Sequence, residues 1–386
     1  MRTPKITVVG AAIFLTLAGP LRAATTSREA LDFAFQFATG IRSDPDDRGK
    51  AQAAVVLEFA NAGDLDTAVK QADEIEGWRR GVVYAELAPR LARQGRATEA
   101  RQLLGKAEAL SQQIKDWTAP RVAAHVARAY ALMGDVAASA RLATNLPTDE
   151  AGKPFAAQVA ALVNDRRTDD ALRLLQEREG TKDFEANVAI ADGYLLVARH
   201  RTLASDWSRR KLALLAAGRV AARLPLLKRA DVGLAVVVEF RQMNYRADAR
   251  QTLQALENLV LSVPCDGEYK APLLTQLAVA WHEMGEPDRA RQLLAQAETV
   301  AVASEPLTRP GALASVAAGY AAVRQPARAH QLFRQSLDSA ATLANARPRA
   351  LAVVEVCRAV GRQGFVLQPE ERVQLTTMFN NLRAPW

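Results

Sequence analysis

Apolar and polar residues recur with a helical period along most of the chain. In residues 274–281, apolar side chains stand at i, i+3, i+4 and i+7, which places them on one face of a helix. Residues 123–130 and 313–320 have the same spacing. Each run predicts a helix with one buried face, and there are few runs of β-branched residues to predict strands.

A landmark residue follows each of these helices and predicts where it ends. In the stretch WHEMGEPDRARQLL, Trp281 lies four residues before Gly285 and Ala290 lies five residues after it. We expect the glycine to end the helix in a left-handed conformation and the alanine to allow two helices to approach closely. The equivalent landmarks are Gly63, Gly95, Gly134, Arg166, Ala198, Asn244, Arg324 and Gly361, at intervals of 32 to 46 residues. Such a period is typical of a helical solenoid.

The units resemble tetratricopeptide repeats. The fullest copy consists of Ala278, Trp281, Gly285, Ala290, Leu294 and Ala297. The resemblance covers about residues 48–365, and it departs from the family where several units exceed 34 residues and where the proline that closes the second helix is missing. It implies an all-α fold, a right-handed α-α superhelix (a TPR-like solenoid) of about eight to nine helix-hairpin units.

The array is expected to occupy residues 24–386 and to have its own end pieces. Residues 24–47 predict an entry helix, since Thr26 and Glu29 have the spacing of a capping box. Residues 366–386 predict a C-terminal capping helix that shields the last repeat, as solenoids require.

The N-terminus has the organisation of a secretory signal peptide over residues 1–23. Arg2 and Lys5 precede an uncharged apolar run over residues 6–19, and Ala23 is a small residue at a cleavage position. The run is shorter than the ~20 residues that span a bilayer, although an uncleaved anchor is the alternative. No cysteine follows the run, so a lipoprotein anchor is not expected. We therefore predict a periplasmic or secreted protein, with no integral membrane span after signal cleavage.

Removal of the signal peptide changes the meaning of the net charge. The formal charge of +8 falls to +5, because residues 1–23 hold three basic and no acidic residues. The remaining basic residues are spread along the chain, which argues against a nucleic-acid partner.

No motif for chemistry stands out. None of the four histidines pairs with another at i, i+4, and no G-x-S-x-G, H-E-x-x-H or phosphate-binding glycine loop is present. We expect no metal site, no cofactor and no enzyme activity. Cys265 and Cys357 lie about three units apart, too far for an intramolecular disulfide.

Three large apolar residues hold one position at the start of the first helices, namely Trp78, Trp117 and Leu307. Because they recur at the same position of successive repeats, we expect them to have a structural role as wedges, that is, large side chains packed between one repeat and the next. Ligand-stacking aromatics are the alternative.

Two surfaces are candidate binding sites. By the resemblance, the first helices line a concave groove that holds a peptide or helix of a protein partner, and the candidate groove residues are Arg128, Asp192, Arg241, His282 and Glu283. The segment 199–234 is unusually basic, and its candidate surface residues are Arg209, Arg210, Lys211, Arg219 and Arg223. These cations suit an acidic partner or a lipid surface, and a solvated helix face is the alternative.

The sequence thus predicts an exported, non-enzymatic protein-interaction scaffold in a bacterial cell-envelope or secretion assembly. The alternative function is an accessory protein of polysaccharide or cell-wall handling that binds acidic glycan through its basic surface.

Overall fold

The computed structural model describes residues 28–147, 150, 152–200, 206–363 and 365–383, and every regular element in these ranges is a helix. The helices are α1 (Arg28–Thr39), α2 (Pro45–Asn61), α3 (Leu65–Ala72), α4 (Trp78–Arg93), α5 (Ala97–Gln113), α6 (Ala119–Leu132), α7 (Val136–Ala143), α8 (Gly152–Asn164), α9 (Thr168–Arg178), α10 (Phe184–Arg199), α11 (Trp207–Ala221), α12 (Leu226–Gln242), α13 (Arg246–Ser262), α14 (Gly267–Glu283), α15 (Pro287–Ala303), α16 (Arg309–Ala322), α17 (Pro326–Ala341), α18 (Ala346–Gly361) and α19 (Pro369–Asn380). The predicted all-α class is confirmed. The signal peptide predicted over residues 1–23 lies outside the described residues.

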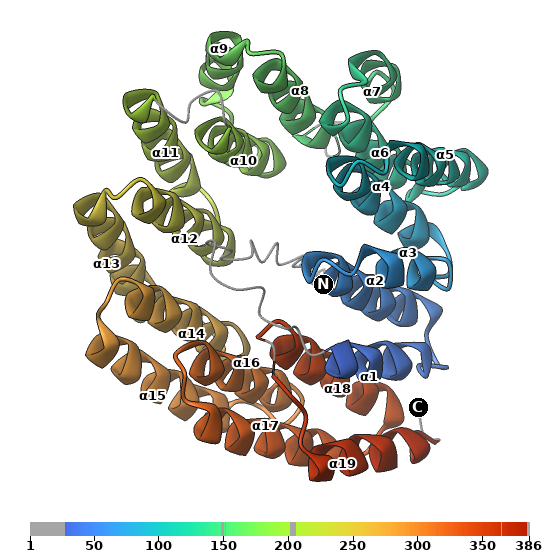
Figure 1. Cartoon of the computed structure of the whole chain (residues 1–386), viewed down its shortest axis with the longest axis vertical. Helices are drawn as coiled ribbons and strands as arrows, with labels where there is room; N and C mark the ends of the chain where they lie inside the picture. Colours follow the sequence, from blue (N-terminus) through green and yellow to red (C-terminus); the bar gives the residue numbers. More distant parts are fainter. Residues whose placement is uncertain (1–27, 148–149, 151, 201–205, 364, 384–386) are drawn as a thin grey trace, which may run out of the picture.

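The helices form two concentric layers (Figure 1). The inner layer holds the even-numbered helices, and the odd-numbered helices lie outside them. α1 packs on α18 and α2 as the other outer helices pack on their two inner neighbours. From α3 to α17, each outer helix packs on the inner helix before it and on the inner helix after it. One apolar core therefore runs through the hairpins without interruption.

The two ends of the array meet. α18 packs on both α1 and α2, and α19 packs on α1. Phe37 of α1 and Phe379 of α19 form an edge-to-face pair with ring centroids 5.5 Å apart. Gly361 lies so close to Leu31 that a Cβ atom there would be 2.8 Å from a leucine methyl carbon. The helices therefore close into a ring, and we call the contacts of α18 and α19 with α1 and α2 the closure.

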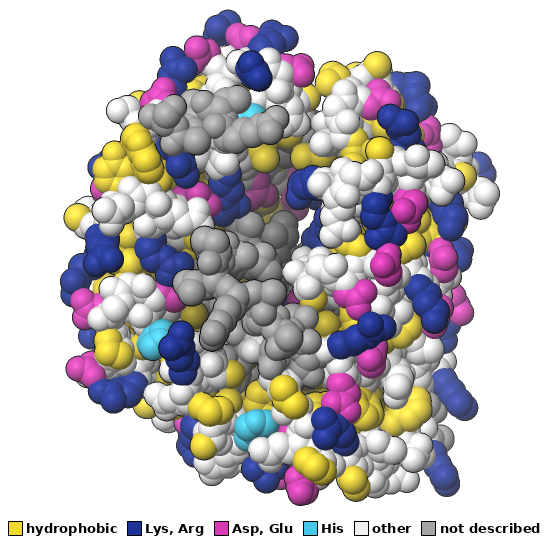
Figure 2. Space-filling model, viewed as in Figure 1, with side chains coloured by type: hydrophobic (Ala, Val, Ile, Leu, Met, Phe, Trp, Pro, Cys, Tyr) yellow, Lys and Arg dark blue, Asp and Glu magenta, His cyan; other side chains and the backbone are white. Residues whose placement is uncertain are grey.

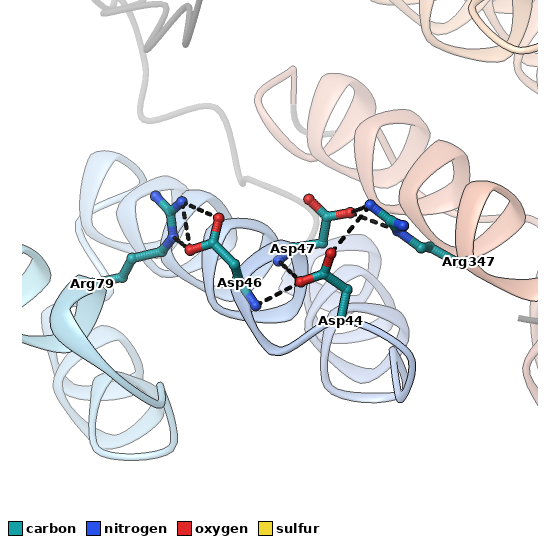
Figure 3. A network of polar contacts seen from close by, with 5 residues as sticks. All are labelled: Asp44, Asp46, Asp47, Arg79 and Arg347. Carbon is teal, nitrogen blue, oxygen red and sulfur yellow. Dashed lines mark hydrogen bonds and ion pairs between the residues drawn. The ribbon is translucent and has the colours of Figure 1, made fainter. Parts of the chain in front are cut away.

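The first turn of α2 connects both neighbouring inner helices (Figure 3). Asp44 caps the helix, because its carboxylate accepts hydrogen bonds from the backbone N–H groups of Asp46 at 2.9 Å and Asp47 at 3.2 Å. Arg79 of α4 donates to both carboxylate oxygens of Asp46 at 2.9 Å. Arg347 of α18 donates through Nε to Asp47 at 2.6 Å. Carboxylates are also stabilised by the dipole at a helix N-terminus. The three aspartates of this turn therefore stabilise α2 as well as binding the neighbouring helices.

A more buried ion-pair cluster also crosses the closure. The Glu58 side chain of α2 is only 6% exposed and accepts a 3.1 Å hydrogen bond from Arg358 of α18 and another from Arg362. Burial raises the pKa of Glu58, but the two guanidinium groups outweigh burial and hold its pKa below the ordinary value. Arg372 and Glu29 add a 2.6 Å hydrogen bond between α19 and α1.

Most landmark residues end their helices as predicted. Positive φ angles near the left-handed region are found at seven landmarks, namely Gly63, Gly95, Gly134, Arg166, Asn244, Gly285 and Arg324. At Gly285, for example, φ is 85°. Three of the seven are not glycine, so the helix ends there in the left-handed conformation although this conformation is sterically unfavourable for a residue with a side chain.

Hydrogen bonding explains the four-residue spacing between the aromatic residue and the landmark. The residue after Gly285 donates its backbone N–H to the carbonyl of Trp281 at 3.0 Å, and Gly285 itself donates to the carbonyl of His282 at 3.0 Å. This pair of bonds is the Schellman motif. The bond to the carbonyl four residues before the landmark recurs at the other six left-handed landmarks.

At two landmarks the prediction of a helix end in the left-handed conformation is wrong. Ala198 lies inside α10, which continues to Arg199. Gly361 is the last residue of α18, but it is not among the residues with positive φ. Its lack of a side chain is required by its close contact with Leu31 at the closure.

The terminal segments take part in the ring. Within residues 24–47, α1 covers Arg28–Thr39 and α2 begins at Pro45, while residues 24–27 lie outside the described ranges. Within residues 366–386, α19 covers Pro369–Asn380 and residues 384–386 are not described.

The wedge interpretation of the recurring Trp and Leu positions needs correction. Trp78 and Trp117 do contact each other between successive repeats, with ring centroids 6.4 Å apart. However, Trp117 is 66% exposed and Leu307 is 60% exposed. Trp117 and Leu307 therefore lie largely at the surface and are not buried between repeats.

Candidate inner-wall binding surface

Charged side chains from five inner helices form what we call the inner-wall network. Its members are Glu86, His125, Arg128, Asp192, Arg199, Lys228, Asp231, Glu239, Arg241 and Glu283, on α4, α6, α10, α12 and α14. Figure 2 shows acidic and basic side chains interspersed over one face of the ring, without an extended patch of one sign.

Glu86 organises the first part of the network. One carboxylate oxygen accepts a 2.8 Å hydrogen bond from Arg128 and lies 2.8 Å from Nδ1 of His125. The side chains of Glu86 and His125 are about one-fifth exposed and that of Arg128 is 35% exposed. Burial raises the pKa of Glu86, but Arg128 and His125 outweigh burial and hold its pKa well below the ordinary value. The carboxylate is therefore ionised and holds both neighbours in place.

A pair of carboxyl groups with raised pKa values lies between α10 and α12. Asp192, Lys228 and Asp231 line a small pocket with apolar walls, whose volume of about 20 Å³ is enough for one water molecule. Burial is the main cause that raises both pKa values, and it outweighs the attraction of Lys228. The pKa of Asp231 reaches about 6, and the neighbouring charge of Asp192 contributes to that shift.

The next part of the network lies deeper in the wall. Glu239 of α12 is 4% exposed and accepts a 2.7 Å hydrogen bond from Nε of Arg199. Arg210 of α11 lies 3.5 Å from the other carboxylate oxygen and donates through Nε to the carbonyl of Ala198 at 2.8 Å. Glu239 thus joins the C-terminal end of α10 to two following helices, and it stabilises the wall more than it presents a surface.

Arg241 and Glu283 form the last pair. Arg241 of α12 donates a hydrogen bond to Glu283 of α14, and both side chains remain about one-quarter exposed. Burial raises the pKa of Glu283, and Arg241 and His282 act against that rise. His282 is partly exposed on α14 beside this pair.

The structure therefore does not bring the five predicted groove residues together in one site, but places them in two separate groups. Arg128 and Asp192 are close enough to influence each other electrostatically, and Arg241, His282 and Glu283 lie together further along the wall. Sequence reasoning missed Glu86 and Asp231, which are the acidic centres of two neighbourhoods. The available signal was an acidic residue on the first helix of a unit, outside the apolar face.

The five predicted basic-surface residues lie on α11 or directly after it, and each has a partner. Their contacts are Arg209 with Asp169 and Asp206, Arg210 with Glu239, Lys211 with Asp248, Arg219 with Glu179, and Arg223 with the Glu179 carbonyl. These contacts connect α11 to neighbouring elements and compensate most of the positive charge of the segment.

The described residues contain no group of three or more His, Cys, Asp and Glu side chains placed to hold a metal ion. Cys265 and Cys357 are both free thiols. No helix in the described ranges has both the length and the apolar composition needed to cross a membrane.

No protein-family model matches this chain, and no curated protein matches it.

Proposed function

We propose that this protein is an exported, non-enzymatic scaffold that holds a polypeptide partner against the inner wall of its ring. In this proposal the hairpins are tetratricopeptide-like repeats in a right-handed array, and the protein serves a cell-envelope or secretion assembly. The observation that carries the proposal is the inner-wall network, in which partly exposed ionised groups from distant parts of the sequence lie on one continuous layer of helices.

The exposure of the network supports binding over a purely structural role. Glu239 is almost fully buried and acts within the fold. By contrast, the side chains of Arg128, Arg241 and Glu283 keep between 25% and 35% of their surface exposed. Polar groups that are held in place and still accessible suit the recognition of backbone and side-chain amides, because little side-chain entropy is lost on binding.

The N-terminal sequence supports the export part of the proposal. Residues 1–23 have the charge and hydropathy pattern of a cleavable signal peptide. A periplasmic or secreted location follows from that pattern, and detection of the mature protein starting at Ala24 in a periplasmic extract tests it.

Affinity capture from an envelope fraction tests the partner site. The bait is the full chain, and the test variant is Arg128→Gln with Arg241→Gln. The matched control is Arg101→Gln with Arg173→Gln, which removes the same charge from exposed positions on outer helices α5 and α9. We expect the same partner to be retained by the wild type and the control and to be lost from the inner-wall variant. Equal retention by both variants contradicts an inner-wall site.

Glycan binding is a second candidate function, and the exposed Trp117 favours it. Trp117 is 66% exposed beside Trp78, and Arg121 lies 4.7 Å from the Trp117 ring centroid. An indole face beside a guanidinium suits an acidic sugar. Retardation of the wild type, and not of Trp117→Ala, on an acidic-polysaccharide column at physiological salt supports this function.

A further inference from the structure

Two arginines of α4 lie beside the inner-wall network without a carboxylate partner of their own. Arg90 and Arg93 follow Glu86 by four and seven residues, so the three side chains share one face of the helix. Arg128 of α6 donates a 2.8 Å hydrogen bond to Glu86. By contrast, neither Arg90 nor Arg93 makes a hydrogen bond or an ion pair with any residue that the structure describes.

The guanidinium group of Arg90 is partly withdrawn from solvent. Its Nη1 atom is buried without a hydrogen-bond acceptor, while the residue as a whole is partly exposed. Burial is the largest cause that lowers the pKa of Arg90, and the positive charges of Arg93 and Arg128 add to that decrease. The group nevertheless stays charged at neutral pH, because arginine does not deprotonate in proteins. A partly buried cation without acceptors is unfavourable in the free protein, and a bound anion would stabilise it.

The two carboxylates that act on Arg90 are already bonded to other cations. Glu86 and Glu58 oppose the decrease in the pKa of Arg90, so both lie near its guanidinium group. However, Glu58 accepts hydrogen bonds from two arginines of α18, and Glu86 accepts one from Arg128. Neither carboxylate is left to neutralise Arg90 and Arg93, and this part of the wall therefore attracts an anion.

We propose that Arg90, with Arg93 beside it, is an anion-binding subsite that takes an aspartate or glutamate side chain of the polypeptide partner. This inference rests on the inner-wall function proposed above and specifies what the partner presents. The planar guanidinium group of an arginine can donate to both oxygens of a carboxylate at once. A carboxylate fits better than a doubly charged anion, because Glu58 and Glu86 would repel the second charge.

Two acetylated and amidated peptides of alternating sequence test the subsite. One consists of Ala and Glu and the other of Ala and Gln, so they differ in charge and neither has a terminal carboxylate. Fluorescence anisotropy of the labelled peptides, titrated with the full chain at low ionic strength, measures binding. We expect saturable binding of the Glu peptide and at least tenfold weaker binding of the Gln peptide.

Substitution of Arg90 separates a binding role from a structural one. Arg90→Met removes the guanidinium group and keeps an unbranched side chain. It should weaken binding of the Glu peptide at least fivefold and raise the melting temperature of the free protein by about 1–3 °C, because a buried donor without an acceptor is removed. Arg90→Lys keeps the charge without the planar group and should weaken binding about threefold. The control, Arg101→Met on exposed α5, should leave binding and melting temperature unchanged.

Several results overturn the subsite. One is the absence of saturable Glu-peptide binding up to about 1 mM, where the weakest specific affinities lie. Another is binding that Arg90→Met does not weaken. A lower melting temperature for Arg90→Met assigns the residue a structural role. Polygalacturonate that binds through Arg90 when the Glu peptide does not assigns the subsite to an acidic glycan and contradicts a polypeptide.

Failure of this inference is distinguishable from failure of the proposed function. In affinity capture from the envelope fraction, loss of the partner from Arg90→Met supports the subsite. A partner that Arg90→Met retains, but that the variant with Arg128→Gln and Arg241→Gln loses, shows that the inner wall binds a partner and that only the subsite is wrong. A partner that all these variants retain contradicts the inner-wall function itself.

Discussion

Arg347 of α18 donates a 2.6 Å hydrogen bond to Asp47 of α2, although 300 residues separate them in the sequence. The contact is one of several that join the two ends of the helical array. Glu58 lies beside Arg358 and Arg362 on the same two helices, and Leu31 packs on Gly361 nearby. The inner wall is therefore a closed surface whose curvature is fixed by the closure.

Addition of a single methyl group at Gly361 should disturb the closure. Gly361→Ala places a Cβ atom 2.8 Å from Leu31, and we expect a loss of about 1–3 kcal/mol in the free energy of unfolding, as for other overpacked sites. The control is Gly105→Ala on outer helix α5, where no atom lies within 4 Å of the new group. That change should stabilise by about 0.5–1 kcal/mol, because alanine favours helix. Urea denaturation measures both, and equal effects contradict the close contact.

The landmark residues predict opposite effects for two substitutions. Gly285→Ala should cost about 1 kcal/mol, because φ is 85° and nothing crowds the added methyl group, so the effect is one of backbone conformation. Arg324→Gly should stabilise by roughly 0.5–1 kcal/mol, because an arginine at φ 63° is strained. Thermal denaturation of both variants checks the pair. A destabilising Arg324→Gly speaks against a strained left-handed residue.

These landmarks also show how far the sequence predicts the fold. The helix stops were predictable, because the Schellman hydrogen bonds join residues only three to five positions apart. The closure was not, because it depends on small rotations between repeats that accumulate around the ring. Gly361 fits the spacing of a helix stop, and the sequence does not reveal that Leu31 packs on it.

The sequence predicted residues that belong to the candidate site, but not which of them contact each other. Arg128, Asp192, Arg241, His282 and Glu283 were chosen because they lie off the apolar face of a first helix. Which of them pair depends on the register between adjacent helices, and a single sequence does not contain that register.

The raised pKa of Asp231 predicts a pH-dependent stability. Its folded-state pKa of about 6 lies above the unfolded value near 3.9, so the carboxyl group penalises folding as pH rises through 4 to 6 and the penalty is complete above that range. Asp231→Asn removes the ionisation. We expect it to raise the free energy of unfolding by about 3 kcal/mol at neutral pH and by little near pH 4.

The control for this pH dependence is Asp165→Asn, at an exposed turn residue. It should change the free energy of unfolding by less than about 0.5 kcal/mol at either pH. Urea denaturation across the pH range measures both variants. A gain for Asp231→Asn that is the same at low and neutral pH is inconsistent with ionisation of a buried carboxyl group.

The two cysteines should differ in reactivity. Cys357 is fully buried in α18, and burial raises the pKa of its thiol, whereas Cys265 is partly exposed between α13 and α14. Because the thiolate is the reactive form, a thiol reagent at about pH 8 should label one cysteine in the native protein and two after denaturation without reductant. Absence of titratable thiols in the denatured monomer demonstrates a disulfide and contradicts the structure.

The distance between spin labels on α2 and α18 tests the closed ring most directly. Lys50→Cys and Glu355→Cys, in a Cys265→Ser background, place nitroxides at exposed positions on helices that pack together. Packed helices have axes about 8–10 Å apart, so pulsed electron paramagnetic resonance should give one narrow distance distribution below about 25 Å. A distribution centred beyond about 40 Å, several helix layers away, shows an open array and contradicts the closure.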